Sequence, residues 1–259
     1  MKANTLKDNL AKGLSIVSRA VASRSPLPVL GNILIATEGA RLRLSATNLS
    51  MAITCWIGAD VEEDGAITVP ARTIVDVVST IEAGDSVSLA LNKTTQTLAL
   101  KASGHKTEIR GIDAEEFPVI PRGGDVEAAP VEFEAAVLRG AIGKTAFCAF
   151  TSEARPVLTG VLVKVGGGKA TFAATDGFRL AAADVSVSGG PAGALIPAKS
   201  LEEVARVLQG FEGAVTMRVV ATSQAIFTAE SIEIVCQLLE GNYPNYESII
   251  PKDSNLTVE

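Results

Sequence analysis

The 259-residue sequence predicts an α+β fold made of two homologous units. The first observation is that residues 25–52 and residues 155–181 have the same layout. Matching positions recur at an offset of about 128 residues, and three such pairs are Leu30 with Leu158, Gly39 with Gly167, and Thr47 with Thr175. The second observation is that one order of helix and strand patterns runs through both halves. Because solenoids and propellers repeat every ~20 to 50 residues, this longer period indicates duplicated domains.

The duplication sets the expected domain boundaries. We place the first domain at residues 1–123 and the second at residues 128–251. Each is large enough to bury its own core, and each is expected to contain two helices packed on antiparallel sheets of about eight strands. Residues 252–259 resemble the opening of the second unit, since both contain a Val-Glu pair. They are expected to begin a third domain that is otherwise missing.

Apolar periodicity predicts the elements of the first unit. The first helix is predicted from apolar residues at steps of four and three and ends before Pro26; these residues are Leu6, Leu10, Leu14, Val17 and Val21. A second helix is predicted after Pro70 and before Gly84, and it carries Arg72. Strand patterns, several of them joined as hairpins, are predicted at 33–36, 42–46, 51–57, 87–91, 97–102 and 105–112.

The second unit repeats this order. A helix is predicted over residues 133–147 and a hairpin turn over residues 166–168. The segment 194–208 stands in the place of the second helix of the first unit, so Lys199 corresponds to Arg72.

Composition excludes several classes of protein. Hydrophobic residues make up 47% of the chain and charged residues 20%, which is typical of a folded globular protein. Cys55, Cys148 and Cys236 form no CxxC pair, so they predict buried free thiols rather than a disulfide framework or a metal site. Since there is no signal peptide and no apolar run of about 18 residues, the protein is expected to be soluble and cytoplasmic, with no membrane partner.

Catalytic and phosphate-binding signals are weak, and no cofactor is expected. The single histidine, His105, lies in a predicted strand, and a catalytic role for it is not favoured. The GGGKAT segment at 166–171 and the GKT segment at 143–145 lack the first glycine of a phosphate-binding loop. The acidic residues around 113–116 lack the spacing of a calcium loop. With 4% aromatic residues, stacking on single-stranded bases is also poorly supported.

The charge distribution is uneven. The net charge of −6 argues against a general nucleic-acid-binding surface. However, the first 24 residues carry five basic side chains against the single acid Asp8, and acidic residues cluster elsewhere. We therefore expect one basic face on an acidic body.

Five segments carry a resemblance to a known family: LPVLGNILI, LSATNLSMAI, ITVPAR, TDGFRLAAADV and EGNYPNYESIIP. In this order and spacing they resemble the bacterial sliding clamp, the beta subunit of replicative DNA polymerase III, over essentially the whole chain. The resemblance implies the DNA clamp fold, with six such domains forming a ring around double-stranded DNA. It also implies a processivity factor rather than an enzyme, which tethers the polymerase without catalysing a reaction.

The resemblance implies which basic residues contact DNA. Arg24, Arg72 and Lys199 are carried over as inward-facing contacts to phosphates. By their position on helices alone, we add Lys12, Arg139 and Lys144 to this set. Contacts from scattered basic side chains to phosphates are independent of sequence, and they suit a protein that must slide.

The resemblance also implies a pocket on the second domain that binds short linear motifs. The expected partners are the DNA polymerase III catalytic subunit, the clamp loader, and other clamp-binding polymerases and repair proteins. The matched residues are Leu158, Thr175, Gly177, Phe178, Arg179, Leu180, Pro244 and Ile249. The alternative is that Leu158, Leu180 and Ile249 are simply core residues. Ser248 stands where the family often has a basic residue, and the third-domain part of the pocket is absent, so we expect weakened binding.

The assembly and two other classes of function remain open at this point. Full-length members close as homo-dimers, whereas a two-domain protein could reach six domains only as a trimer. We expect a fragment that is monomeric or weakly associated. The competing functions are a hydrolase or transferase with its site between the repeats, and a duplicated β-rich binding module unrelated to DNA.

Overall fold

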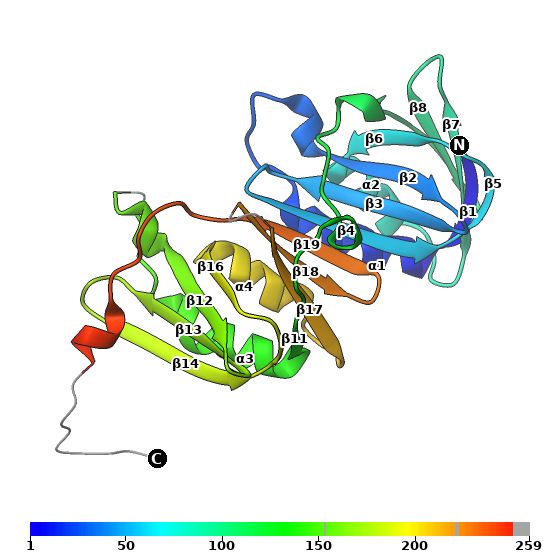
Figure 1. The fold of residues 1–259 in the computed structure, drawn as a ribbon. Helices are drawn as coiled ribbons and strands as arrows, with labels where there is room; N and C mark the ends of the chain where they lie inside the picture. The colour runs from blue at the N-terminus through cyan, green and yellow to red at the C-terminus, as the bar shows by residue number, and fades with distance from the viewer. Residues whose placement is uncertain (153, 221–222, 251–259) are drawn as a thin grey trace. The chain divides into compact units, whose positions relative to one another are not determined.

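The computed structural model describes residues 1–152, 154–220 and 223–250, which fall into two compact units (Figure 1). The first unit comprises Met1–Glu127 and Ile226–Gln237. The second comprises Ala128–Ala225 and the described residues from Leu238 onward. The predicted opening of a third domain at 252–259 lies outside the described residues, and the domain boundaries predicted from sequence stay a prediction.

The first unit consists of two short helices and two antiparallel sheets. Its elements are β1 (Lys2–Leu6), α1 (Lys7–Val17), β2 (Asn32–Glu38), β3 (Arg41–Thr47), β4 (Met51–Gly58), β5 (Asp60–Glu63), β6 (Ala66–Pro70), α2 (Ala71–Ser79), β7 (Ser86–Asn92), β8 (Thr97–Ala102), β9 (His105–Arg110), β10 (Ile112–Asp113) and, later in the chain, β19 (Ile232–Gln237). One sheet has the order β5-β1-β7-β8-β9, and in the other the neighbours run β10-β6-β2-β3-β4-β19. Helix α1 packs on β3 and β4 and against α2.

The second unit repeats this arrangement. Its elements are β11 (Val131–Glu134), α3 (Ala135–Thr145), β12 (Gly160–Gly166), β13 (Lys169–Thr175), β14 (Leu180–Ser186), β15 (Ser188–Gly189), β16 (Ala192–Pro197), α4 (Ala198–Val207) and β17 (Ala214–Val220). The next strand, β18 (Gln224–Ala229), begins in the second unit, and its residues from Ile226 onward belong to the first. A four-stranded sheet has the order β14-β13-β12-β16, which makes β14 and β16 its edges, and β17, β11 and β15 are neighbours in order. Helix α3 packs on β13 and β14 and against α4. The predicted α+β class and the hairpin turn at 166–168 are confirmed.

The start of each unit differs from the prediction in the same way. Residues 2–6 form strand β1, which pairs with β5 and β7, so the predicted first residue of the helix, Leu6, lies in a strand and is 52% exposed. Helix α1 ends at Val17 and a 3₁₀ turn follows, which leaves Val21 outside the helix. In the second unit, Phe133 lies in β11 rather than in α3. The apolar side chains happen to continue the helical spacing, whereas the strand is selected by distant partner strands that local periodicity does not reveal.

The three cysteines are buried and free, which confirms the prediction from their spacing. Burial raises the pKa of Cys55 to about 11 and that of Cys236 to about 12, so neither thiol is reactive near neutral pH. Among the described residues, no helix is long and apolar enough to cross a membrane.

Candidate DNA-contact and partner-binding sites

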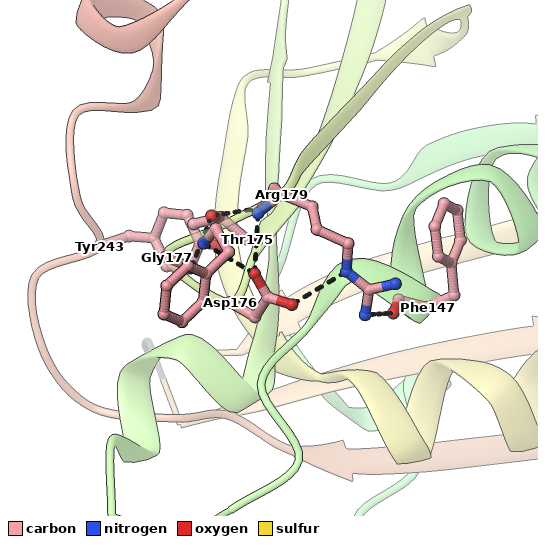
Figure 2. Close-up of polar contacts among 7 residues, drawn as sticks. Phe147, Thr175, Asp176, Gly177, Arg179 and Tyr243 are labelled. Carbon is pink, nitrogen blue, oxygen red and sulfur yellow. Dashed lines mark hydrogen bonds and ion pairs between the residues drawn. The ribbon is translucent and has the colours of Figure 1, made fainter.

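A tight turn at residues 175–179 carries four of the eight predicted partner-pocket residues (Figure 2). It follows β13, whose last residue, Thr175, is 5% exposed. The Thr175 hydroxyl donates to the Arg179 carbonyl at 2.7 Å and accepts the Gly177 amide at 3.0 Å. A shielded hydroxyl therefore holds the turn, because hydrogen bonds away from water are stronger than exposed ones.

Asp176 also holds this turn, although it was not among the predicted site residues. Its Oδ1 atom accepts the amides of Phe178 and Arg179, both at 2.9 Å, and its Oδ2 atom accepts Nε of Arg179 at 2.9 Å (Figure 2). The backbone bonds from Arg179 and Phe178, followed by the Arg179 side chain, lower the pKa of Asp176 to about 2. The signal in the sequence is an aspartate followed by glycine, a common pattern in turns in which the carboxylate binds the next amides.

The turn is expected to respond to acid below pH 4. Asp176 has a folded-state pKa of about 2 against an ordinary value of 3.8, so its ionised form stabilises the turn above about pH 4, and this contribution is lost as the pH falls towards 2. An NMR titration should therefore show the amide protons of Phe178 and Arg179 unchanged down to about pH 4 and shifting below about pH 3.

The matched control is Asp176→Asn, because Asn48 holds the corresponding turn of the first unit. This variant should keep both amide hydrogen bonds and lose the acid titration. A titration midpoint near 4 in the unmodified protein would show that the carboxylate is not engaged as described.

The corresponding turn of the first unit has the same hydrogen bonds between side chains and the backbone. There the Thr47 hydroxyl donates to the Met51 carbonyl and accepts the Leu49 amide, and the Asn48 side-chain oxygen accepts the amides of Ser50 and Met51. A positive φ occurs at Leu49 (72°) in the first unit and at Gly177 (93°) in the second, where glycine adopts it without strain. The backbone of the turn therefore belongs to the shared fold, and the two copies differ in the side chains that they present.

The side chains of the second turn present an apolar and cationic surface. Phe178 is 96% exposed, and Phe147, in the 3₁₀ turn that follows α3, is 58% exposed. The Arg179 guanidinium lies 5.7 Å from the centre of the Phe147 ring and donates to the Phe147 carbonyl at 3.1 Å (Figure 2). Arg179 therefore connects the turn to the chain that follows α3. Exposed aromatic and arginine side chains of this kind are enriched at protein interfaces.

A second segment reaches this turn through Tyr243. The Tyr243 hydroxyl accepts the Thr175 amide at 2.9 Å (Figure 2), and burial raises the pKa of the phenol. This bond brings the predicted pocket residue Pro244 close to the turn, since it is the next residue along the chain. Sequence reasoning missed this role of Tyr243, because the repeat aligns it with Phe117, which has no hydroxyl.

The remaining predicted pocket residues are not core residues. Leu158 and Leu180 are half-buried, and Ile249 is 60% exposed on the 3₁₀ turn Tyr246–Ile249. Tyr246 itself is buried, and Lys164 Nζ lies 5.8 Å from the centre of its ring. Partial exposure of large aliphatic side chains is what a binding surface requires, and it counts against the alternative in which these residues only fill the core.

The basic residues predicted to contact DNA lie on helices or just after them. Arg72 and Lys199 occupy equivalent positions, each the second residue of a helix that follows a proline, α2 after Pro70 and α4 after Pro197. Both are exposed, and the Arg72 guanidinium lies 3.8 Å from the Asp76 carboxylate on its own helix. The other exposed members of the set are Lys12 on α1, Lys144 on α3 and Arg24 after α1.

Arg139 is different from the other five basic residues. It is half-buried, and its Nη1 atom donates to the carbonyls of Leu208 at 2.7 Å and Phe211 at 2.8 Å, just beyond the last residue of α4. A cation at a helix C-terminus satisfies carbonyls that have no partner within the helix. The geometry therefore favours a structural role for Arg139, which joins α3 to the end of α4.

Comparisons with known proteins agree over both units. Family models for the DNA polymerase III beta subunit match residues 1–121 with its N-terminal domain and residues 132–245 with its central domain. A beta sliding clamp from Synechocystis sp. is 35% identical over 281 residues, covering 100% of this chain and 71% of the relative. A beta sliding clamp from Bacillus subtilis is 28% identical over 270 residues, covering 100% of this chain and 70% of the relative.

Solved structures agree with the fold. The crystal structure of the DNA polymerase sliding clamp from Bacillus subtilis has a TM-score of 0.92 at 28% identity, covering 98% of this chain and 68% of that one. The clamp from Pseudomonas aeruginosa bound to griselimycin has a TM-score of 0.91 at 27% identity, covering 98% and 69%. A duplicated unit of two helices on antiparallel sheets is thus the architecture of a sliding clamp. The chain belongs to the DNA polymerase III beta subunit family, the bacterial beta sliding clamps.

Proposed function

We propose that the chain acts as a processivity factor, a non-catalytic subunit that holds a DNA polymerase on double-stranded DNA. The observation that carries this proposal is that both units match the clamp family in sequence and in fold over nearly the whole chain. The two competing functions are not favoured, because the relatives that match the whole chain are beta sliding clamps.

The proposed DNA contacts are Arg24, Arg72 and Lys199, with Lys12 and Lys144 in support. Their exposure and their places on or beside helices suit contacts to phosphates that exchange readily with water and ions. Arg139 contributes less, because its guanidinium already bonds two carbonyls. Contacts to phosphates alone are independent of the DNA sequence. A protein that slides along DNA requires this independence.

The proposed partner pocket is formed by the turn at 175–179, Leu180 and the neighbouring Pro244, with Leu158 and Ile249 at its margins. Exposed Phe178 and half-buried Leu180 supply apolar area, while the hydrogen bonds of Thr175 and Asp176 hold the backbone in place. A pocket organised before binding loses less entropy when a peptide docks. We propose that the polymerase III catalytic subunit, the clamp loader and other clamp-binding proteins dock here.

Griselimycin is a suitable probe of this pocket, because a related clamp has been solved with it. Isothermal titration calorimetry should detect its binding to the chain, and Leu180→Ala should weaken binding by about tenfold or more, as expected for truncation of a central apolar contact. Phe178→Ala should weaken binding as well, because it removes exposed apolar area beside the turn.

The control for these variants is Val119→Ala, which removes an apolar side chain that is 97% exposed in the first unit. It should leave griselimycin affinity unchanged. Equal affinities for the unmodified chain, Leu180→Ala and Phe178→Ala would place the binding site elsewhere on the molecule.

A further inference from the structure

Residues 118–125, which we call the strap, cross one face of the first unit's sheet (Figure 1). Helix α1 packs on the opposite face of β3 and β4, where Leu44 lies against Gly13. Because side chains alternate along a strand, Arg43 and the residue paired with it, Trp56, point to the face that does not carry α1. The sheet is therefore covered by a helix on one face and by the strap on the other.

The strap is anchored at two places. Phe117, which precedes it, is buried in an apolar cluster of the first unit. Near the other end, the Arg122 guanidinium donates two hydrogen bonds to the Glu38 carboxylate, at 2.8 Å and 3.3 Å. Val119, between these anchors, is 97% exposed. The end of the strap therefore depends on the contacts of Arg122 and its neighbours.

The strap also lies close to strands that come much later in the chain. A Cβ atom added at Gly123 would lie 2.9 Å from Oγ1 of Thr228, on β18, and 3.3 Å from Oε1 of Glu233, on β19. Both distances are shorter than ordinary contacts between heavy atoms, so a residue without a side chain lets the strap lie directly on these strands. Since Glu38 is on β2, the strap spans the sheet from β2 to β18.

Glu38 lies between two arginines. Its carboxylate binds Arg122 of the strap and lies 3.4 Å from Nε of Arg43 on β3. Burial alone would raise the pKa of Glu38, but Trp56 and the two arginines outweigh this effect and lower the pKa. Burial and the charge of Arg122 lower the pKa of Arg43, because like charges repel each other. Glu38 therefore holds two repelling charges together.

Trp56 completes the anchor at the end of the strap. The centre of its ring lies 6.0 Å from the guanidinium carbon of Arg122 and 5.9 Å from that of Arg41. An arginine that binds a carboxylate through two hydrogen bonds and also lies on an aromatic ring has one preferred geometry, which makes such a pair stronger than an ordinary surface ion pair. The anchor is therefore strong enough for its loss to be measured.

We propose that Glu38 controls whether the strap is closed, through the negative charge that it places between Arg43 and Arg122. With this charge, the end of the strap is held on the sheet. Without it, the two arginines repel each other and the end of the strap leaves the sheet, while Phe117 stays in its cluster. Because the second unit begins at Ala128, the released residues then become part of the connection to that unit.

Glu38→Gln tests this proposal, because glutamine has nearly the same shape and no charge. The amide of Asp125 donates to the Arg122 carbonyl at 3.2 Å, so its hydrogen exchange reports on the end of the strap. In the variant, this amide should exchange about tenfold faster or more, as expected for the loss of hydrogen bonds to a charged group. The Phe117 amide, at the buried anchor, should exchange at its original rate.

Fluorescence gives a second readout, because Trp56 is the only tryptophan of the chain. Acrylamide should quench its emission more strongly in Glu38→Gln, since the strap no longer shields the ring. The matched control is Glu62→Gln, which neutralises an exposed glutamate that pairs with Lys2 on the other sheet of the unit. This control should change neither the hydrogen exchange of the strap nor the quenching.

A double variant separates repulsion between the arginines from the simple loss of a hydrogen-bond acceptor. Glu38→Gln combined with Arg43→Met removes one of the repelling charges, so the Asp125 amide should recover most of its protection. The proposal is overturned if this amide exchanges at its original rate in Glu38→Gln, or if the double variant exchanges as fast as the single one. Equal acceleration of the amides of β8, in the other sheet, would also overturn it, since Glu38 would then stabilise the whole unit rather than the strap.

Discussion

Replacing Arg24, Arg72 and Lys199 together by glutamate is expected to lower the affinity of the chain for duplex DNA by on the order of 10²-fold at 0.1 M salt. Each lost phosphate contact reduces the magnitude of the slope of log affinity against log salt concentration by about 0.9. The loss of three such contacts is therefore enough to account for most of the expected fall in affinity. All three side chains are exposed, which makes the substitutions compatible with folding.

The measurement is fluorescence anisotropy of a labelled duplex over a series of salt concentrations. The charge-matched control reverses Lys93, Lys101 and Lys106, three exposed lysines on or between β7, β8 and β9. It changes net charge by the same amount and should retain most of the affinity. If both triple variants lose affinity equally, the effect is one of total charge, and the assignment of Arg24, Arg72 and Lys199 fails.

Phe133→Ala is expected to destabilise the second unit by about 3–5 kcal/mol, the usual cost of removing a large aromatic side chain from a core. Phe133 on β11 is 2% exposed, and its ring meets the ring of Phe172, on β13, edge to face with the centres 6.1 Å apart. The truncation loses this contact and leaves a cavity, because hydrogen bonds to neighbouring strands keep the surrounding strands from moving in to fill it.

The free energy of unfolding should be measured by urea titration, with Phe178→Ala as the control of identical chemistry. Phe178 is 96% exposed, so its truncation should change the free energy of unfolding by no more than about 0.5 kcal/mol. Similar decreases in the free energy of unfolding for the two variants would contradict the placement of Phe133 in the core and of Phe178 on the surface.

Local patterns predicted most elements of the fold. The strand pairs β2–β3 and β12–β13 and the helices after Pro70 and Pro197 follow from alternation, turn residues and helix-start signals that lie within a few residues of one another. Local periodicity does not predict strand β1, because it places Leu6 in the helix. Strand β1 exists because β5 and β7 flank it, and those partners come tens of residues later in the chain.

The candidate sites show the same limit. Comparison of the repeats identified residues 177–180 as the place where the copies diverge, and the structure shows that the backbone of the turn is common to both. The part played by Tyr243 in joining two segments was not predictable, because its hydroxyl bonds an amide 68 residues away. The bonds of Arg139 to the end of α4 were missed for the same reason, since they span 69 and 72 residues.

The sequence by itself determined the duplication, the α+β class and the family, because periodicity and motifs are properties of the order of residues. Only the tertiary structure decided which partners the differing side chains of the two copies meet. Phe117 is buried in a cluster with Val29, Leu30 and Leu34 in the first unit, whereas the hydroxyl of its counterpart Tyr243 accepts the Thr175 amide in the second. The physical reason is that burial and hydrogen bonding depend on partners brought together by folding, and an alignment of two similar residues does not contain those partners.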